Sequence, residues 1–95
     1  MELKEHFTGF YEAIYVDHRI KPVHISMYMA LLLGYLLHAN ENPIEIDRDT
    51  LMLQAKISAR STYYKCLQEL HEFGYIKYVP SYNLYLGSLV YLKRI

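Results

Sequence analysis

Apolar side chains recur at spacings of three and four near the start of the chain. Leu3, Phe7, Phe10 and Ile14 form this stripe, and such spacing is typical of one face of an amphipathic helix. The pattern predicts a helix over residues 3–18. The stripe is also heptad-like, so two interpretations stay open: it closes the core of its own domain, or it joins two copies of the chain.

The next segment is apolar nearly all round. Residues 25–37 read ISMYMALLLGYLL, a run that is too short to span a membrane and therefore indicates a buried core helix. Pro22 suits the first turn of that helix, because proline lacks the backbone N–H that a first turn leaves unpaired. We expect this helix to continue to about Ala39, to lie at the centre of the fold and to have no membrane partner.

Turn and cap residues divide the following part of the chain into shorter elements. Residues 44–46 alternate between apolar and polar, which indicates a short edge strand. Asp47 is expected to cap a helix of about nine residues, and Ser58 to cap a longer helix. The longer helix should run to Phe73 and stop at Gly74, since glycine readily adopts the left-handed conformation that closes helices.

β-branched and aromatic residues dominate the last part of the sequence. They are frequent in residues 75–79 and 88–92, which flank a loop and so predict a β-hairpin. The predicted fold class is α+β, mainly α with a small β-hairpin. We expect a single domain over residues 1–95, made of N-terminal helices (1–40), a strand (44–46), a helix pair (47–74) and the hairpin (75–95).

The composition supports a single domain, and the charge distribution suggests a class of binding partner. Ninety-five residues, 53% of them hydrophobic, suffice for one core. The single cysteine, Cys66, excludes an intrachain disulfide and predicts a cytoplasmic location. Residues 1–55 hold four bases and eight acids, a net charge of −4, whereas residues 56–95 hold six bases and two acids, a net charge of +4. This split suggests a side that faces a polyanion, or else chance scatter over a solvated surface.

A specific pattern lies in residues 55–78, which read AKISARSTYYKCLQELHEFGYIKY. An apolar turn residue, Ile57, precedes a polar helix start, a run of apolar positions and a glycine stop. With the strand before it and the hairpin after it, the pattern resembles winged helix-turn-helix DNA-binding proteins. Together with the earlier motif PVHISMY, it is similar to short winged-helix transcriptional regulators that accompany bacterial mobile elements. The resemblance implies double-stranded DNA binding, with 47–74 as the helix-turn-helix and 75–95 as the wing.

The second helix of this pair has two different sides. Apolar positions fall on one side and polar positions on the other, and the polar side would enter the major groove by its N-terminal end. Arg60 offers a guanidinium for guanine, Gln68 an amide for adenine, and the nearby hydroxyls and lysines offer contacts to phosphates or base edges. The predicted DNA-binding residues are Lys56, Ser58, Arg60, Ser61, Thr62, Tyr64, Lys65, Gln68 and Lys77.

Several of these residues also have a purely structural interpretation. Arg60 and Lys65 could simply be charged residues on the solvent side of a helix, where such residues are common. Tyr64 could pack under the hairpin instead of stacking on a sugar or a base. Ser61 and Thr62 lie near a helix start, where hydroxyls can satisfy unpaired backbone N–H groups.

The hairpin loop departs from the pattern of a DNA-binding wing. Its tip, residues 82–86, reads YNLYL and offers no cation to a phosphate, and Lys77 lies on the strand before it. Exposed tyrosine and leucine suit a protein partner equally well. The alternative function is therefore a protein-interaction or replication-initiation module that uses the Tyr/Leu-rich wing.

Enzymatic function finds no support in the sequence. The five histidines do not pair at metal-ligand spacing with each other or with Cys66, and no Gly-rich phosphate loop or nucleophile motif is present. We expect no catalytic residue, no metal site and no cofactor.

The number of cations favours a homodimer. One winged helix with about four phosphate contacts would show a log–log salt slope of only about −3.6 and would bind weakly at physiological salt. A homodimer through Leu3, Phe7, Phe10 and Ile14 would read two half-sites, unless this stripe serves its own core.

Overall fold

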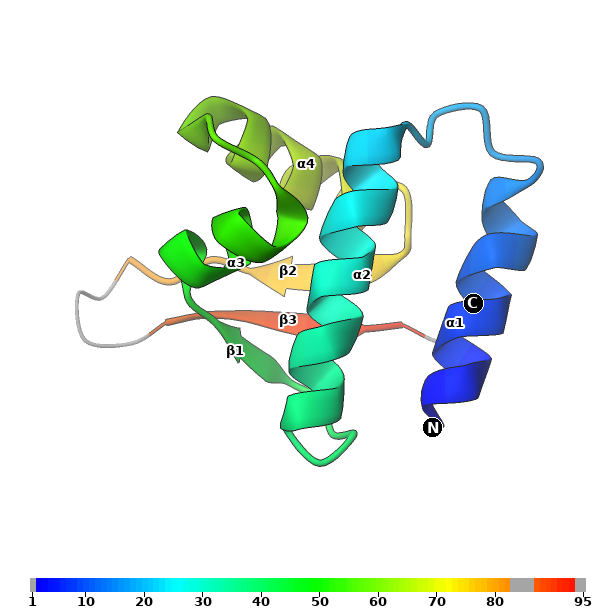
Figure 1. Ribbon diagram of the computed structural model, residues 1–95, viewed down its shortest axis with the longest axis horizontal. Helices are drawn as coiled ribbons and strands as arrows, with labels where there is room; N and C mark the ends of the chain where they lie inside the picture. The colour runs from blue at the N-terminus through cyan, green and yellow to red at the C-terminus, as the bar shows by residue number, and fades with distance from the viewer. Residues whose placement is uncertain (1, 83–86, 94–95) are drawn as a thin grey trace.

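Four α-helices and one small antiparallel sheet account for residues 2–82 and 87–93, which are the residues that the computed structural model describes (Figure 1). The helices are α1 (Leu3–Ile14), α2 (Pro22–Leu37), α3 (Arg48–Ala55) and α4 (Arg60–Glu72), and the strands are β1 (Ile44–Ile46), β2 (Ile76–Val79) and β3 (Ser88–Leu92). The predicted α+β class is confirmed at this level.

Helix α2 is central, as its apolar sequence predicts. It contacts α1, α3, α4 and two of the three strands, and Figure 1 shows it between α1 and the rest of the molecule. It ends at Leu37 and not near Ala39, because Ala39 and Asn40 both adopt a left-handed φ of 58° that a helix cannot continue through. Within the described ranges no helix combines the length and the apolar character that a membrane crossing needs.

The sheet has the order β1–β3–β2, and both pairings are antiparallel. The predicted hairpin is thus confirmed, and β1 is an edge strand as expected. Ile44 pairs with Val90 and Ile76 pairs with Leu92, and these four side chains are buried. Since side chains alternate along a strand, this apolar side is the one that packs against the helices.

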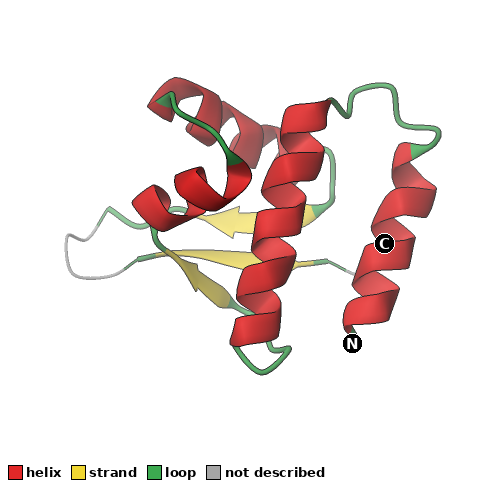
Figure 2. Cartoon of the chain, viewed as in Figure 1, coloured by secondary structure: helices red, strands yellow, loops and turns green. Residues whose placement is uncertain are grey.

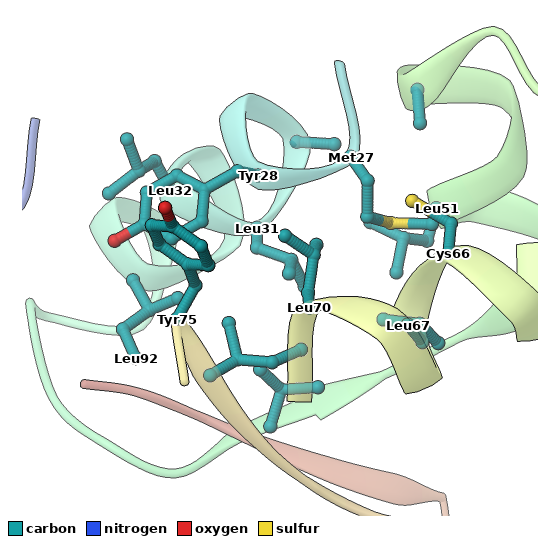
Figure 3. Packing of buried hydrophobic residues seen from close by; sticks show 14 of the residues in the cluster. Met27, Tyr28, Leu31, Leu32, Leu51, Cys66, Leu67, Leu70, Tyr75 and Leu92 are labelled. Atoms are coloured by element: carbon teal, nitrogen blue, oxygen red, sulfur yellow. The ribbon is translucent and has the colours of Figure 1, made fainter. Parts of the chain in front are cut away.

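Within the core, α2 packs against α4 as well as against α3. In Figure 3, Leu31 of α2 points toward Leu70 of α4, and Met27 lies near Cys66. All four side chains are 1% exposed or less. This packing fixes α4 through one side only and leaves its other side in solvent.

Helix α1 is shorter than predicted, because it ends at Ile14 and not at residue 18. After two turn residues, the carboxylate of Asp17 accepts a hydrogen bond from the Tyr75 hydroxyl at 2.7 Å. The same carboxylate is held by the Arg19 guanidinium through contacts of 2.9 and 2.8 Å. A tertiary contact across 58 positions therefore competes with the continuation of the helix.

The apolar stripe of α1 serves mostly its own domain. Phe10 is fully buried and stacks on Tyr28, with ring centroids 3.8 Å apart and an interplanar angle of 5°. Leu3 and Ile14 pack partly against the same core. Phe10 thus belongs to the core of its own chain. Phe7, in contrast, is 47% exposed.

The two ends of the molecule carry different elements. The chain measures 37 Å along its longest axis. Figure 2 shows α1 at one end of this axis, whereas the α3–α4 pair lies toward the other end. A surface on α1 is therefore well separated from a surface on α4.

Candidate nucleic-acid interface

A four-residue turn, residues 56–59, connects α3 to α4. Lys56 ends α3 in the left-handed conformation with a φ of 59°. The N–H of Ile57 donates to the Met52 carbonyl at 2.9 Å, and the Ile57 side chain is buried. The turn is therefore anchored in the core, while Lys56 stays exposed at the corner between the two helices.

The two predicted helix caps have different outcomes. The Asp47 cap is confirmed, because its carboxylate accepts a hydrogen bond from the Thr50 N–H at 3.0 Å. The Ser58 cap is wrong: Ala59 occupies the N-cap position of α4 and makes no side-chain hydrogen bond. The helix consequently starts at Arg60, and no side-chain cap occupies its first backbone N–H groups.

The buried side of α4 is held by polar contacts as well as by packing. The Cys66 thiol donates to the Val23 carbonyl at 3.5 Å, and burial raises the pKa of this thiol to about 12. Glu69 turns inward, and its Oε1 lies 3.1 Å from Nε2 of the buried His24. Because Nδ1 of His24 accepts the Lys21 N–H at 2.9 Å, Nε2 carries the proton and donates to Glu69.

The exposed side of α4 gathers most of the predicted DNA-binding residues. The side chains of Arg60, Ser61, Thr62, Tyr64, Lys65 and Gln68 are all exposed on this helix, and Lys56 and Ser58 are exposed in the turn before it. The first two turns of the helix carry no acidic residue. The structure thus brings eight of the nine predicted residues to one helix and its leading turn.

Tyr64 does not pack under the hairpin. Its ring meets the Tyr63 ring edge-on at 5.0 Å, and Tyr63 is the buried partner of the two. The Tyr64 hydroxyl instead lies 3.4 Å from a guanidinium nitrogen of Arg48, the first residue of α3. The geometry therefore agrees with the interpretation in which the Tyr64 ring is exposed, and not with packing under the hairpin.

Arg48 is a candidate that the sequence reasoning missed. Hydrogen bonds to Tyr64 and to Asp49, the latter at 3.2 Å, raise the pKa of its guanidinium. This side chain stands beside the exposed side of α4 and offers a further cation. No local pattern could reveal it, because Arg48 and Tyr64 are 16 positions apart and belong to different helices.

The far end of the α4 surface is less favourable to a polyanion. The Gln68 amide nitrogen donates to the Glu72 carboxylate at 3.2 Å, and Glu72 is exposed. Gln68 would have to leave this contact to meet a base. The cationic part of the surface is therefore confined to the first two turns of α4, the turn before them and Arg48 beside them.

Lys77 is the predicted residue that the structure does not bring to this surface. Its neighbour Ile76 is buried among the helices, so Lys77 points to the opposite side of the sheet. There its ammonium group lies 5.4 Å from the centre of the Tyr91 ring, on the neighbouring strand. Lys77 is thus a sheet residue, apart from the α4 surface.

The predicted wing tip is only partly visible. Tyr82 is 94% exposed, whereas residues 83–86 lie outside the described residues. The base of the loop is tied down, since the Gly87 N–H donates to the Glu45 carboxylate at 3.2 Å.

Side chains suited to metal binding or catalysis are not grouped on this surface. Among residues 2–82 and 87–93, no three His, Cys, Asp or Glu side chains lie close enough together to hold a metal ion. Cys66 is buried and has a raised pKa, so its thiolate is not available at neutral pH.

Comparisons with known proteins add no relative. No family model, no curated protein and no solved structure matches this chain. The fold and the surface chemistry of α4 therefore carry the functional argument alone.

Proposed function

We propose that this chain is a winged-helix transcriptional regulator that binds double-stranded DNA in a sequence-specific manner. The observation that carries the proposal is the exposed start of α4. There Arg60, Ser61, Tyr64 and Lys65 stand in solvent on two helical turns without an acidic residue. Such a combination of cations, hydroxyls and an aromatic ring is suited to phosphates and base edges.

The order of the elements supports the winged-helix part of the proposal. A strand, a short helix, a turn and a longer helix are followed by two antiparallel strands. That is the order expected for a helix-turn-helix with a wing. The longer helix is anchored through its apolar side, which is what a recognition helix needs in order to present its other side rigidly.

The proposed mode of binding places the N-terminal half of α4 in the major groove. Lys56 and Lys65 would neutralise phosphates, together with Arg48 from α3. Arg60 would read a guanine through two parallel hydrogen bonds. Gln68 would contribute only after leaving Glu72, so its share in specificity should be smaller.

The size of the cationic surface sets the expected salt dependence. With Lys77 on the other side of the sheet, this mode of binding has three phosphate contacts, from Lys56, Lys65 and Arg48, while Arg60 reads a base. One copy of the chain should therefore show a log–log salt slope of about −2.7.

Fluorescence anisotropy with a labelled 30-base-pair duplex over a salt series tests the proposal. Removing the Lys65 charge in Lys65→Gln should weaken binding and reduce the magnitude of the salt slope by about 0.9 per copy. Lys93→Gln is the matched control, because Lys93 is exposed directly after β3, and its N–H donates to the Tyr75 carbonyl, beyond the opposite end of α4 from the proposed surface. Absent binding at low salt, or equal effects of both substitutions, would contradict the proposal.

The alternative function, a protein-interaction module, is favoured by one different observation. At the base of the wing, a hollow of about 450 Å³ is lined by Val79, Pro80, Tyr82 and Leu89 among others. Aromatic and apolar side chains of this kind are frequent at the centres of protein interfaces. Under this alternative, the unchanged chain should not bind DNA. Tyr82→Asp should abolish its binding to the protein partner.

A further inference from the structure

Hydrogen bonds just before β1 determine which backbone groups of that strand face β3. The Asn42 side chain donates to the Leu92 carbonyl at 2.9 Å and accepts the Leu92 N–H at 3.0 Å. Asn42 lies opposite Leu92 in the register that joins Ile44 to Val90, so both backbone groups of Leu92 point toward the β1 side of β3. Since the direction of these groups alternates along an antiparallel pair, Ile44 and Val90 exchange hydrogen bonds in the same way.

The alternation leaves the backbone groups of Glu45 on the free edge of β1. Its N–H and C=O point away from β3, and neither has a hydrogen-bond partner among the described residues. On the other edge of the sheet, the outward N–H of Tyr78 donates to Nδ1 of His71 at 3.0 Å. Figure 1 shows β1 at one margin of the sheet. An edge with unpaired backbone groups is a template on which a further strand can pair.

A hollow of about 220 Å³ lies beside this edge, on the side of the sheet that faces the helices. Its apolar lining comes from α2, β1 and α3: Leu31, Gly34, Leu37, Ile44, Ile46 and Leu51. Leu31 and Leu51 are buried, whereas Leu37 is 70% exposed. A dry cavity of about 150 Å³ holds a benzene molecule, so this hollow has room for an aliphatic side chain.

The charge around the hollow is negative. The acidic residues of its described lining are Glu45 and Asp47, and that lining contains neither lysine nor arginine. The Glu45 side chain points to the side of the sheet opposite to Ile44, where its Oε1 accepts the Gly87 N–H at 3.2 Å. A carboxylate accepts several hydrogen bonds, and Glu45 is exposed, so a cation can reach it. The edge of β1 is therefore suited to a basic partner, in contrast to the start of α4.

A strand added to this edge would present its side chains in a fixed order. The residue that pairs with Glu45 directs its side chain to the same side of the sheet as Glu45, beside the carboxylate. The residues before and after it point to the helix side, where Ile44, Ile46 and the hollow lie. A basic residue between two aliphatic residues is complementary to both sides.

We infer that the free edge of β1 binds an extended peptide segment of a partner protein, in which a lysine or arginine stands between two aliphatic residues. The peptide pairs with the N–H and C=O of Glu45, its cation meets the Glu45 carboxylate, and an aliphatic side chain enters the hollow beside Leu37 and Leu51. Strand addition to an exposed sheet edge is a general mode of peptide recognition. The site does not depend on DNA binding, because its lining comes from α2, β1 and α3 and not from α4.

Nuclear magnetic resonance of the isotope-labelled full chain tests the inference, with acetyl-TLKVT-amide as the probe. In the free protein, the amide hydrogen of Glu45 should exchange with water at least about tenfold faster than those of Ile44 and Ile46, which bond β3. The peptide should bind with a dissociation constant of about 200 µM, shift the signals of β1 and slow the exchange at Glu45. Acetyl-TSKST-amide keeps the charge and lacks the aliphatic residues, so it should bind at least about tenfold more weakly.

Two substitutions test the contacts separately. Glu45→Lys should weaken binding of acetyl-TLKVT-amide at least about tenfold, and acetyl-TLEVT-amide should bind this variant more tightly than it binds the unchanged chain. Leu37→Ser should also weaken binding. Leu33→Ser is its matched control, because Leu33 is 41% exposed on α2 but outside the hollow. Circular dichroism verifies that each variant is folded, and Leu37→Ser decides the matter if Glu45→Lys does not fold.

The outcomes separate this inference from the DNA-binding proposal. The inference is overturned by unchanged β1 signals at about 5 mM peptide, or by a Glu45 amide hydrogen that exchanges as slowly as its neighbours. Equal effects of Leu37→Ser and Leu33→Ser overturn it as well, as does equal binding of the peptide without aliphatic residues. Peptide binding at β1 in a chain that does not bind duplex DNA would support the inference and contradict the proposed function.

Discussion

At the scale of one residue, the side chain and the backbone of Lys56 have opposing requirements. Its side chain is exposed beside the start of α4, where a cation is useful to a DNA-binding surface. Its backbone, however, has a φ of 59°, a region in which any side chain with a Cβ atom is unfavourable. A glycine would suit the turn better than a lysine does.

Replacement of Lys56 should therefore separate stability from binding. Lys56→Gly should raise the free energy of unfolding by about 0.5 kcal/mol, since it relieves the left-handed strain. Lys56→Ala, the matched control, removes the same charge and keeps the Cβ atom, so it should give no such gain. Both variants should bind duplex DNA more weakly than the unchanged chain does. Urea unfolding and anisotropy measure the two effects, and a Lys56→Gly variant less stable than Lys56→Ala would refute the argument.

The buried hydroxyl of Tyr28 leads to a second prediction about stability. The Tyr28 hydroxyl is buried without a hydrogen-bond partner among the described residues, and burial raises the pKa of the phenol. Tyr28→Phe removes this polar group and keeps the ring that stacks on Phe10. The free energy of unfolding should stay equal or rise by up to about 1 kcal/mol. A thermal unfolding midpoint clearly below that of the unchanged protein would show that the hydroxyl is satisfied in solution.

Local sequence determined the features that were predicted correctly. Asp47 caps α3 through Thr50, three residues away, and Gly74 follows α4 with a φ of 90°. The Ser58 cap failed because Ala59 takes the cap position, although cap preferences favour serine over alanine. The end of α1 and the Arg48–Tyr64 contact depend on partners 58 and 16 positions away, so no local pattern contains them.

At the scale of elements, the pose of α4 depends on its contact with the start of α2. Glu69 is the acid of α4 that turns inward, where its carboxylate accepts a hydrogen bond from the Nε2–H of His24. Glu72, one turn later, is exposed and pairs only with Gln68 among the described residues. Two glutamates on one helix thus have different tasks.

Alanine substitutions of these two glutamates should separate the tasks. Glu69→Ala leaves the buried His24 N–H without an acceptor and should cost about 1 to 2 kcal/mol in the free energy of unfolding. Glu72→Ala should change stability by less than about 0.5 kcal/mol. It should also strengthen DNA binding, because it removes a like charge and releases Gln68. Equal stabilities of the two variants in urea would contradict this division.

At the scale of the whole molecule, Asp17 joins the N-terminal helices to the sheet. Hydrogen bonds from Arg19 and from the Tyr75 hydroxyl hold the pKa of its carboxyl well below its usual range. The Arg19 guanidinium also lies 4.3 Å from the centre of the Phe73 ring, at the end of α4. One carboxylate therefore connects the loop after α1 with the end of α4 and the start of β2.

The hydrogen bonds of Asp17 with Arg19 and Tyr75 should make the free energy of unfolding depend on pH under acidic conditions. A carboxyl with a lowered pKa in the folded state stabilises the fold above its unfolded value of about 3.8. That stabilisation is lost as the pH falls toward the folded pKa. Asp17→Asn should be less stable at pH 7 by about 1 kcal/mol and should lose less stability on acidification. Urea midpoints between pH 7 and about 2 measure this, with the exposed Asp49→Asn as control; an equally steep loss in Asp17→Asn would refute the role.

The strand order β1–β3–β2 also has a consequence for how the chain is made. β3 lies between the two other strands, yet it follows both of them in the sequence. Neither β1 nor β2 has a hydrogen-bonding neighbour until β3 has left the ribosome, and a lone strand is not stable in water. The helices can begin to form during synthesis, whereas the sheet must close in one late step. A nascent chain halted before Ser88 would therefore present two unpaired strands to the chaperones and proteases of the cell.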